Sequence, residues 1–394
     1  MIVCHVITRL IVGGAQENTL LTCDGLHARG HAITLITGPQ AGPEGSLLEQ
    51  ARAAGYRLRV VPELGRAIRP IRDARARSEL AAILAHIRPD IVHTHSSKAG
   101  ILGRLAARDA GVPIIVHSIH GMSFNRTQRP LVRALLRRAE RHCARFTDQF
   151  ISVADAMTDQ AVAAGLGPPE KFVTIYSGMC TDRYAPGRYD RQAVRQSWGV
   201  AANEVVVGTV ARLFRHKGYE QLIPAMAHAA RHAGHLRFVW VGGGKHRARY
   251  ERRLKALGLR ARVHLTGLIE PAEIPRMLAG MDILVHPSQW EGLPRSAVQA
   301  LLMERPVISF DIDGTPEVVI PETTGVLVPL NDIRQLAQAM VTLAGDAARR
   351  AQFGSAGRRL CLERFGQKVM VDAIERLYQE LLAAKTRRLR SPDD

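Results

Sequence analysis

The chain has 394 residues, 46% of them apolar and only 5% aromatic, so it can bury two cores built mainly from aliphatic side chains. Its formal net charge of +18 is shared by both halves and favours anionic partners: phosphorylated metabolites, nucleic acid or an anionic membrane. The five scattered cysteines argue against a disulfide framework or a zinc site, and no stretch approaches the ~18 apolar residues that span a bilayer.

Strand-like apolar runs alternate with amphipathic helical stretches in chain order. The start, M-I-V-C-H-V-I-T, reads as a first strand rather than a signal peptide, so we expect a cytoplasmic protein. In the first half the runs lie at 2–8, 32–37, 57–62, 90–95, 113–119, 149–153 and 172–177, and helical stretches lie at 16–28, 71–87, 98–110 and 128–146. We interpret the polar segment 178–203 as the interdomain connection. Further runs follow at 204–211, 236–242, 262–266, 281–286, 306–310 and 325–329, before a closing helix at 367–383.

Near-continuous apolar strands with crossover helices indicate parallel sheets buried on both faces. The sequence therefore predicts an α/β protein with two Rossmann-like, doubly wound domains that face each other across a cleft. The first domain spans 1–185 and is joined by the closing helix, 367–384, which crosses back to it; the second spans 186–366.

The first constellation that carries chemistry is G-T-V-A-R-L-F-R-H-K-G, residues 208–218, between a strand and the next helix. Arg212, Arg215 and Lys217 place three cations on one turn beside a helix N-terminus, where a diphosphate would be held. Such donors stabilise the charge that grows on a departing phosphate oxygen. A solvated basic loop is the alternative.

The second constellation is H-P-S-Q-W-E-G-L-P-R-S-A-V-Q-A-L, residues 286–301. A strand delivers Ser288 and Glu291 to the sheet edge, and a helix is expected to start at about Pro294. The amides of Gly292 and Leu293 would point out of that helix start towards an anion or a sugar hydroxyl. A surface glutamate in a turn is the alternative.

With G-G-A-Q (13–16), H-T-H-S-S-K-A-G (93–100), H-G (120–121), V-G-G-G (241–244) and D-G-T-P-E-V-V (313–319), the two constellations resemble family 4 of the retaining glycosyltransferases. The motifs match in order over nearly the whole chain. The resemblance implies the GT-B fold and transfer of a sugar from a nucleotide sugar. It favours UDP as the nucleotide and implies no metal or other cofactor.

The resemblance also implies roles for individual residues. Arg212 and Lys217 match the family's diphosphate-binding pair, Glu291 the glutamate that binds the transferred sugar, and His120 the histidine that contacts the donor sugar. Donor-binding candidates are Gly13, Gly14, Ile269, Ser288, Gly292, Leu293, Pro294 and Gln299, and acceptor-side candidates are Arg9, Gln16 and Lys98.

Three positions depart from the family pattern. Gln299 stands where a second glutamate usually holds the ribose; its amide offers one acceptor and one donor group, so it would hold the ribose more weakly. Glu304 stands where a glycine is usual, and Cys180 replaces an aspartate. We interpret the last two as changes in local geometry.

Possible metal ligands are interpreted as structural. Asp311-Ile312-Asp313 has the spacing of metal-dependent sugar transferases, but we expect it to cap a loop. His93-x-His95 and the pair His117 and His120 lack a further carboxylate or cysteine.

The stretch 129–146 places Arg133, Arg137, Arg141 and Arg145 four residues apart in one basic stripe, with Leu131, Leu135, Ala139 and Phe146 on an apolar side. Contact with an anionic inner membrane is one interpretation, supported by a second arginine cluster at 66–77, and a solvated helix packed against a sheet is the other.

The predicted function is retaining transfer of a hexose or N-acetylhexosamine to a saccharide or lipid-linked acceptor in envelope polysaccharide synthesis. The alternatives are a two-domain binding protein without turnover and a GT-B nucleotide-sugar epimerase. Specific nucleic-acid binding is not expected, because no recognition motif accompanies the charge.

Overall fold

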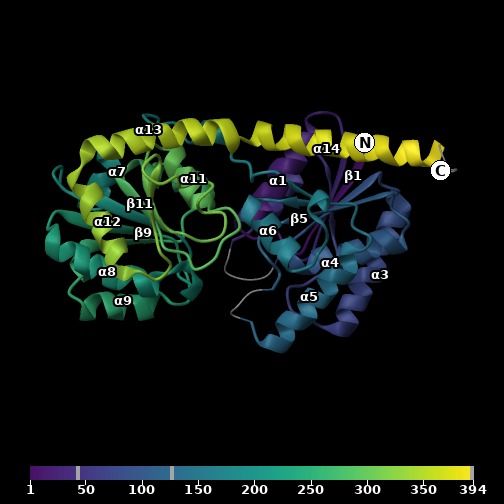
Figure 1. Cartoon of the computed structure of the whole chain (residues 1–394), viewed down its shortest axis with the longest axis horizontal. Coiled ribbons are helices and arrows are strands. Elements are labelled where there is room, and N and C mark those ends of the chain that lie inside the picture. Colours follow the sequence, from purple (N-terminus) through teal and green to yellow (C-terminus); the bar gives the residue numbers. More distant parts are fainter. Residues whose placement is uncertain (41–44, 125–127, 391–394) are drawn as a thin grey trace. The chain divides into compact units, whose positions relative to one another are not determined.

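A computed structural model describes the chain except residues 41–44, 125–127 and 391–394 (Figure 1). It divides into two units, Met1–Met179 with Gln367–Asp394 and Cys180–Gly366. This division lies close to the boundary expected at residues 185 and 186.

The first unit contains a seven-stranded sheet in the order β3-β2-β1-β4-β5-β6-β7, with every neighbouring pair parallel. Its strands are β1 (Ile2–Ile7), β2 (Ala32–Thr37), β3 (Arg57–Val60), β4 (Ile91–His95), β5 (Ile114–Ile119), β6 (Gln149–Ser152) and β7 (Phe172–Thr174). Its helices are α1 (Gly14–His27), α2 (Leu48–Ala53), α3 (Pro70–Ile87), α4 (Ser97–Asp109), α5 (Pro130–Ala144), α6 (Asp155–Ala163) and α14 (Gln367–Arg390).

The second unit contains a six-stranded parallel sheet in the order β10-β9-β8-β11-β12-β13. Its strands are β8 (Val205–Val210), β9 (Leu236–Val241), β10 (Val263–Gly267), β11 (Ile283–His286), β12 (Val307–Phe310) and β13 (Gly325–Val328). Its helices are α7 (Arg191–Ser197), α8 (Tyr219–His232), α9 (Arg247–Ala256), α10 (Ile274–Ala279), α11 (Arg295–Leu302), α12 (Ile333–Gly345) and α13 (Ala347–Arg364). The prediction of two doubly wound parallel-sheet units is confirmed.

Each sheet reverses its strand order once, between β1 and β4 in the first unit and between β8 and β11 in the second. In open α/β sheets, ligands bind beyond the carboxyl ends of the strands that flank such a reversal. The two motif-bearing turns of the second unit follow β8 and β11. The topology therefore brings both of them to the position at which a ligand is expected.

The first unit has a core on each face of its sheet. One core joins β1 and β2 to α1 and to α14, whose Met370, Val371, Ile374 and Tyr378 are buried. The other core packs α3 and α4 against the opposite face. The closing helix is thus part of the first unit, as the apolar pattern of 367–383 predicts. No helix within the described residues is both long and apolar enough to cross a bilayer.

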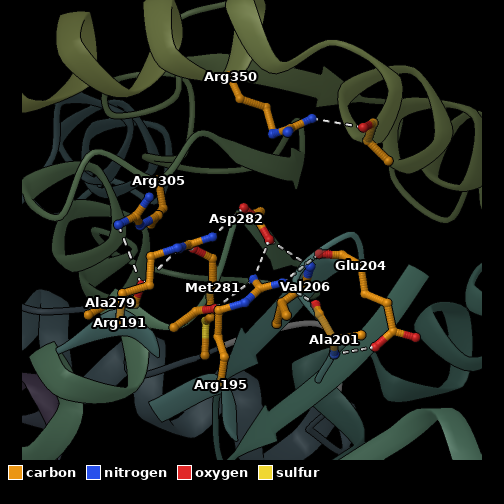
Figure 2. A network of polar contacts seen from close by, with 12 residues as sticks. Arg191, Arg195, Ala201, Glu204, Val206, Ala279, Met281, Asp282, Arg305 and Arg350 are labelled. Atoms are coloured by element: carbon orange, nitrogen blue, oxygen red, sulfur yellow. Dashed lines mark hydrogen bonds and ion pairs between the residues drawn. The ribbon is translucent and has the colours of Figure 1, made fainter. Parts of the chain in front are cut away.

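One element of the sequence interpretation is wrong. Segment 178–203 is not only a connection, because residues 191–197 form α7, which belongs to the second unit. The Asp190 carboxylate caps this helix by accepting a hydrogen bond from the Ala193 amide. Arg191 and Arg195 reach from α7 to the half-buried carboxylate of Asp282 at 2.6 and 2.9 Å (Figure 2). A helix of seven residues with this polar pattern gives no clear apolar periodicity in the sequence.

Candidate active site

The turn after β8 carries the three predicted cations of the second unit. Arg215–Lys217 forms a single 3-10 turn, and α8 begins at Tyr219 after Gly218. Gly218 has a φ of +76°, and a Cβ on it would lie 1.6 Å from the carbonyl oxygen of Pro287. Glycine is therefore required here, because the turn after β8 packs directly against the turn after β11.

Further contacts hold these two turns together. The rings of His216 and Trp290 stack with centroids 4.8 Å apart. The backbone carbonyl of His216 accepts hydrogen bonds from the Gln289 amide at 2.9 Å and from the Ser288 hydroxyl at 3.3 Å. Ser288, a predicted donor-binding residue, is buried and so acts here as a bridge between the turns.

The structure places Lys217 and Glu291 in contact. The Lys217 ammonium donates to the Glu291 carboxylate, and His286 Nε2 lies 3.2 Å from the same carboxylate oxygen. His286 Nδ1 is in turn 3.0 Å from the Ser296 hydroxyl. Burial alone would raise the pKa of Glu291, but the Lys217 ammonium and His286 hold this pKa well below its usual range. Glu291 is therefore a fixed negative charge beside a fixed positive one.

Arg212 is half-buried at the end of β8, and its guanidinium carbon lies 5.1 Å from the centre of the Phe214 ring. Stacking on an aromatic face fixes the plane of a guanidinium while leaving its N–H groups to bind oxygen atoms. Arg212, Lys217 and Glu291 thus project from the two turns that the contacts of His216 and Gly218 hold together.

The helix that follows Glu291 starts where the sequence predicts. Pro294 is the N-cap of α11, and Gly292, Leu293 and Pro294 are buried in the approach to it. Gln299 lies half-buried on the second turn of α11. The Glu291 amide donates to Asp313 at 2.8 Å, in agreement with the interpretation of Asp313 as a loop cap. Ile269 follows β10 and is half-buried.

In the first unit, the predicted residues cluster at the ends of β1, β4 and β5. Gly13 is the N-cap of α1, and Gly14 and Gln16 lie in its first turn. Arg9 is half-buried in the loop before it. His120 directly follows β5. Its Nε2 lies 3.1 Å from Nδ1 of His95, at the end of β4.

Lys98, an acceptor-side candidate, is engaged by residues around the start of α3. Its ammonium lies 2.5 Å from the Asp73 carboxylate and also donates to the Ala67 carbonyl. Both partners belong to the segment around the start of α3, so Lys98 ties α4 to α3.

Sequence reasoning missed His5 and His286. The His5 ring lies in the middle of β1, and its Nδ1 is 3.0 Å from Nε2 of His95. Within the part of the chain that the structure describes, the one cluster of three potential metal ligands is His5, His93 and His95. In both cases, the sequence showed a histidine in an otherwise apolar strand, which could have indicated a functional residue.

Comparisons with known proteins agree with this architecture. The family model for glycosyl transferases group 1 matches residues 190–360, and that for a glycosyl transferase 4-like domain matches residues 13–178. The chain is 30% identical over 396 residues to 2-deoxystreptamine N-acetyl-D-glucosaminyltransferase of Streptomyces fradiae, covering 92% of this chain and 90% of that one.

A second relative is the UDP-Gal:alpha-D-GlcNAc-diphosphoundecaprenol alpha-1,3-galactosyltransferase of Escherichia coli. It is 29% identical over 387 residues, covering 97% of this chain and 98% of the relative. Among solved structures, that of Anabaena HepE in complex with UDP and glucose superposes with a TM-score of 0.83 at 22% identity, covering 96% of this chain and 99% of HepE. The chain is therefore an enzyme that belongs to family 4 of the glycosyltransferases, the nucleotide-sugar-dependent transferases with the GT-B fold.

Proposed function

We propose that the enzyme transfers a hexose or N-acetylhexosamine from a UDP-linked donor to a saccharide or lipid-linked acceptor in cell-envelope polysaccharide synthesis, with retention at the anomeric carbon. The observation that carries the proposal is the joined pair of turns after β8 and β11, which presents Arg212 and Lys217 beside Glu291. The cations suit a diphosphate and the carboxylate suits sugar hydroxyls.

In the proposed reaction the bond between the anomeric carbon and the diphosphate oxygen breaks while the acceptor oxygen forms a bond on the same face. The acceptor proton passes to the departing phosphate oxygen, so no side chain has to gain or lose it. Arg212 and Lys217 stabilise the charge that develops on the leaving diphosphate. Because two fixed cations supply this charge, we expect no metal requirement.

The choice of donor and acceptor draws on the relatives. The E. coli relative is named for UDP-Gal and for a diphosphoundecaprenol acceptor, and the HepE structure contains UDP. Because the choice of nucleotide draws on relatives, the panel of donors below includes UDP, GDP and ADP sugars.

A lipid-linked acceptor would bring the enzyme to a membrane surface, and α5 supports such a peripheral contact. In its N-terminal turns, Leu131 is 82% exposed and Leu135 is 59% exposed. These two side chains therefore do not pack against a sheet, as they would in a helix whose apolar side covers the sheet and whose basic side faces solvent. Three arginines of the stripe line a hollow of about 420 Å³ on the same helix, Arg137, Arg141 and Arg145, together with Ala134, Arg138 and His142. Exposed apolar residues beside arginines suit the surface of an anionic bilayer.

The experiment is a thermal-shift panel of UDP-glucose, UDP-galactose, UDP-N-acetylglucosamine, GDP-mannose and ADP-glucose on the wild type, Arg212→Ala and Arg252→Ala. Arg252 is an exposed arginine of α9 in the same unit and belongs to neither of the two turns, so Arg252→Ala is the matched control. We expect a UDP sugar to stabilise the wild type and the control but not Arg212→Ala. Equal stabilisation of all three proteins would remove Arg212 from the site.

Turnover of the stabilising donor then separates the alternatives. A transferase forms a glycosylated lipid-linked acceptor and releases UDP, and EDTA is expected to leave the rate unchanged. Binding without release of UDP would favour the binding protein, and a changed sugar still joined to UDP would favour the epimerase.

A further inference from the structure

Three histidines of the first unit form a continuous hydrogen-bonded chain that runs from the middle of β1 to the carboxyl ends of the neighbouring strands. His5 lies on β1, His95 ends β4 and His120 follows β5. His5 Nδ1 is 3.0 Å from His95 Nε2, and His95 Nδ1 is 3.1 Å from His120 Nε2. Both nitrogens of His95 are therefore engaged, one by each neighbour.

The inner members of the chain are held neutral. His5 and His95 are fully buried, and burial lowers the pKa of His5 to about 3. Burial, and then the neighbouring histidines, hold the pKa of His95 well below its usual range. A neutral imidazole has one N–H donor and one acceptor nitrogen. The direction of one hydrogen bond in this chain therefore fixes the direction of the other.

Two directions are possible for the chain. If His5 donates through Nδ1, His95 donates to His120 Nε2, and the proton of His120 sits on Nδ1. If the chain runs the other way, His5 carries its proton on Nε2. That nitrogen is buried and has no hydrogen-bond partner within the described residues. Buried N–H groups left without an acceptor are rarer in proteins than acceptors left without a donor.

We infer that His5 and His95 are positioning residues, which hold His120 in the tautomer with its proton on Nδ1 and its Nε2 accepting from His95. The consequence for catalysis rests on the proposed function, together with the role that the family resemblance implies for His120, which is contact with the donor sugar. There, the chain would make Nδ1 of His120 a hydrogen-bond donor to a sugar or phosphate oxygen, rather than an acceptor.

His93 provides a matched control within the same cluster. It is fully buried, and its ring lies 4.2 Å from that of His95. Its own nitrogens are taken up by the hydroxyls of Tyr378 at 2.6 Å and Ser118 at 2.7 Å, so it stands outside the chain.

The competing explanation of the cluster is a bound metal. The potential ligand atoms of His5, His93 and His95 lie within 4.8 Å of one another. However, a metal would have to displace the Tyr378 or the Ser118 hydroxyl from His93 and break one of the two histidine hydrogen bonds of His95, contacts with distances between 2.6 and 3.1 Å. The hydrogen-bonded chain accounts for the same contacts without an ion.

The test is nitrogen NMR of ¹⁵N-histidine-labelled, full-length protein without ligand, which distinguishes protonated from unprotonated ring nitrogens. The His120 signal is assigned by its loss in His120→Gln. We expect the wild type to show the proton on Nδ1. His5→Phe and His95→Phe should each abolish this preference and give a mixture of tautomers, whereas His93→Phe should keep it.

Two outcomes would contradict the inference. A wild-type His120 protonated on Nε2 would overturn it without any variant. Metal at one equivalent per chain in wild-type protein purified without chelator, and absent from His5→Phe, would overturn it too.

A binding measurement separates this inference from the proposed function. UDP-glucose and UDP serve as probes, titrated into the wild type, His5→Phe and His93→Phe. We expect His5→Phe to weaken UDP-glucose binding by about 5- to 10-fold with UDP binding unchanged, as for a lost hydrogen bond to the sugar. If the tautomer shifts in His5→Phe but neither probe responds, the chain is real and the assignment of His120 to the sugar site is wrong.

Discussion

At the scale of single residues, the proposed site combines a cation, which would attract a donor diphosphate, with an anion, which would repel it. Lys217 and Glu291 are both mostly buried, with side chains 20% and 14% exposed, and their charges neutralise each other. A diphosphate would take over part of the Lys217 charge. Glu291 would then be left to accept hydrogen bonds from the sugar.

This division of roles predicts opposite effects of Glu291→Gln on binding and on turnover. The amide keeps the size of the side chain but removes the charge, so UDP should bind at least as tightly as to the wild type. Sugar transfer should fall by about 100-fold, because two hydrogen bonds from sugar hydroxyls to a charged acceptor are weakened. Calorimetry with UDP and a transfer assay measure the two effects.

Glu220→Gln is a suitable control, since Glu220 is another ion-paired carboxylate of the second unit, held by Arg249 and Arg253. It should leave both quantities unchanged. Weaker UDP binding by Glu291→Gln would show that Glu291 organises the diphosphate site rather than the sugar site.

Individual residues also show how far sequence alone could go. Glu304 was recognised as occupying a position usual for glycine, and its φ of +57° bears this out. The roles of Lys217 and Glu291 followed from the resemblance, but their mutual ion pair did not. The link from His5 to His120 could not be predicted either, because the residues are far apart in the chain and are brought together only by the pairing of β1 with β4 and of β4 with β5.

At the scale of elements, α7 illustrates a helix that is held by charge. Asp282 accepts from Arg191, Arg195 and the Val206 amide, so it joins α7 to the start of β8 (Figure 2). Burial alone would raise the pKa of Asp282, but these partners, Arg191 first, lower it. The helix therefore depends on an ionised carboxylate.

We expect Asp282→Asn to destabilise the second unit by about 3 kcal/mol, because Arg195, only 9% exposed, loses its charged partner. Trp198 ends α7 and lies beside Gly280, so its fluorescence should report detachment of the helix. Asp332→Asn, at the half-buried N-cap of α12, should cost about 1 kcal/mol or less. Equal losses in the two variants would contradict a special role for Asp282.

The second element-scale prediction concerns α5. Arg133→Glu with Arg137→Glu should reduce binding to vesicles containing anionic lipid by at least 10-fold, since each basic residue near such a surface contributes about 1 kcal/mol. Leu131→Ser with Leu135→Ser should also weaken it. These four side chains are exposed, so the fold should be unaffected.

The matched control is Arg252→Glu with Lys255→Glu, which makes the same change of charge on exposed positions of α9 in the second unit. Similar loss of vesicle binding in this control would mean that net charge, and not the surface of α5, governs the association.

At the scale of the whole molecule, buried histidines are distributed unequally between the two units. His5, His93, His95 and His117 are buried in the first unit, and burial lowers the pKa of each one. In the unfolded chain such histidines titrate near pH 6.5. Between that pH and the lowered folded pKa, the unfolded state binds more protons, so stability falls as the pH falls. Each such histidine contributes a loss of up to about 1.4 kcal/mol per pH unit.

We therefore expect the first unit to lose stability faster than the second on going from pH 7.5 to pH 5. All three tryptophans, Trp198, Trp240 and Trp290, lie in the second unit, so tryptophan fluorescence follows that unit and circular dichroism follows both. The melting temperature by circular dichroism should fall more steeply than that by fluorescence, and His93→Phe should reduce the difference. Parallel shifts of the two signals would show that the buried histidines do not control acid stability.

The sequence by itself determined the alternation of strands and helices, the two parallel sheets and the family, because apolar periodicity and ordered motifs are local in the chain. Segment 178–203 shows the limit of local reasoning, since α7 is stabilised by Asp282, which is distant in sequence. Only the tertiary structure decided that Lys217 pairs with Glu291, that Lys98 is tied to Asp73, and that His5 reaches His120 through His95. These contacts depend on which strands become neighbours in the sheets, and strand order is a property of the folded chain rather than of any segment.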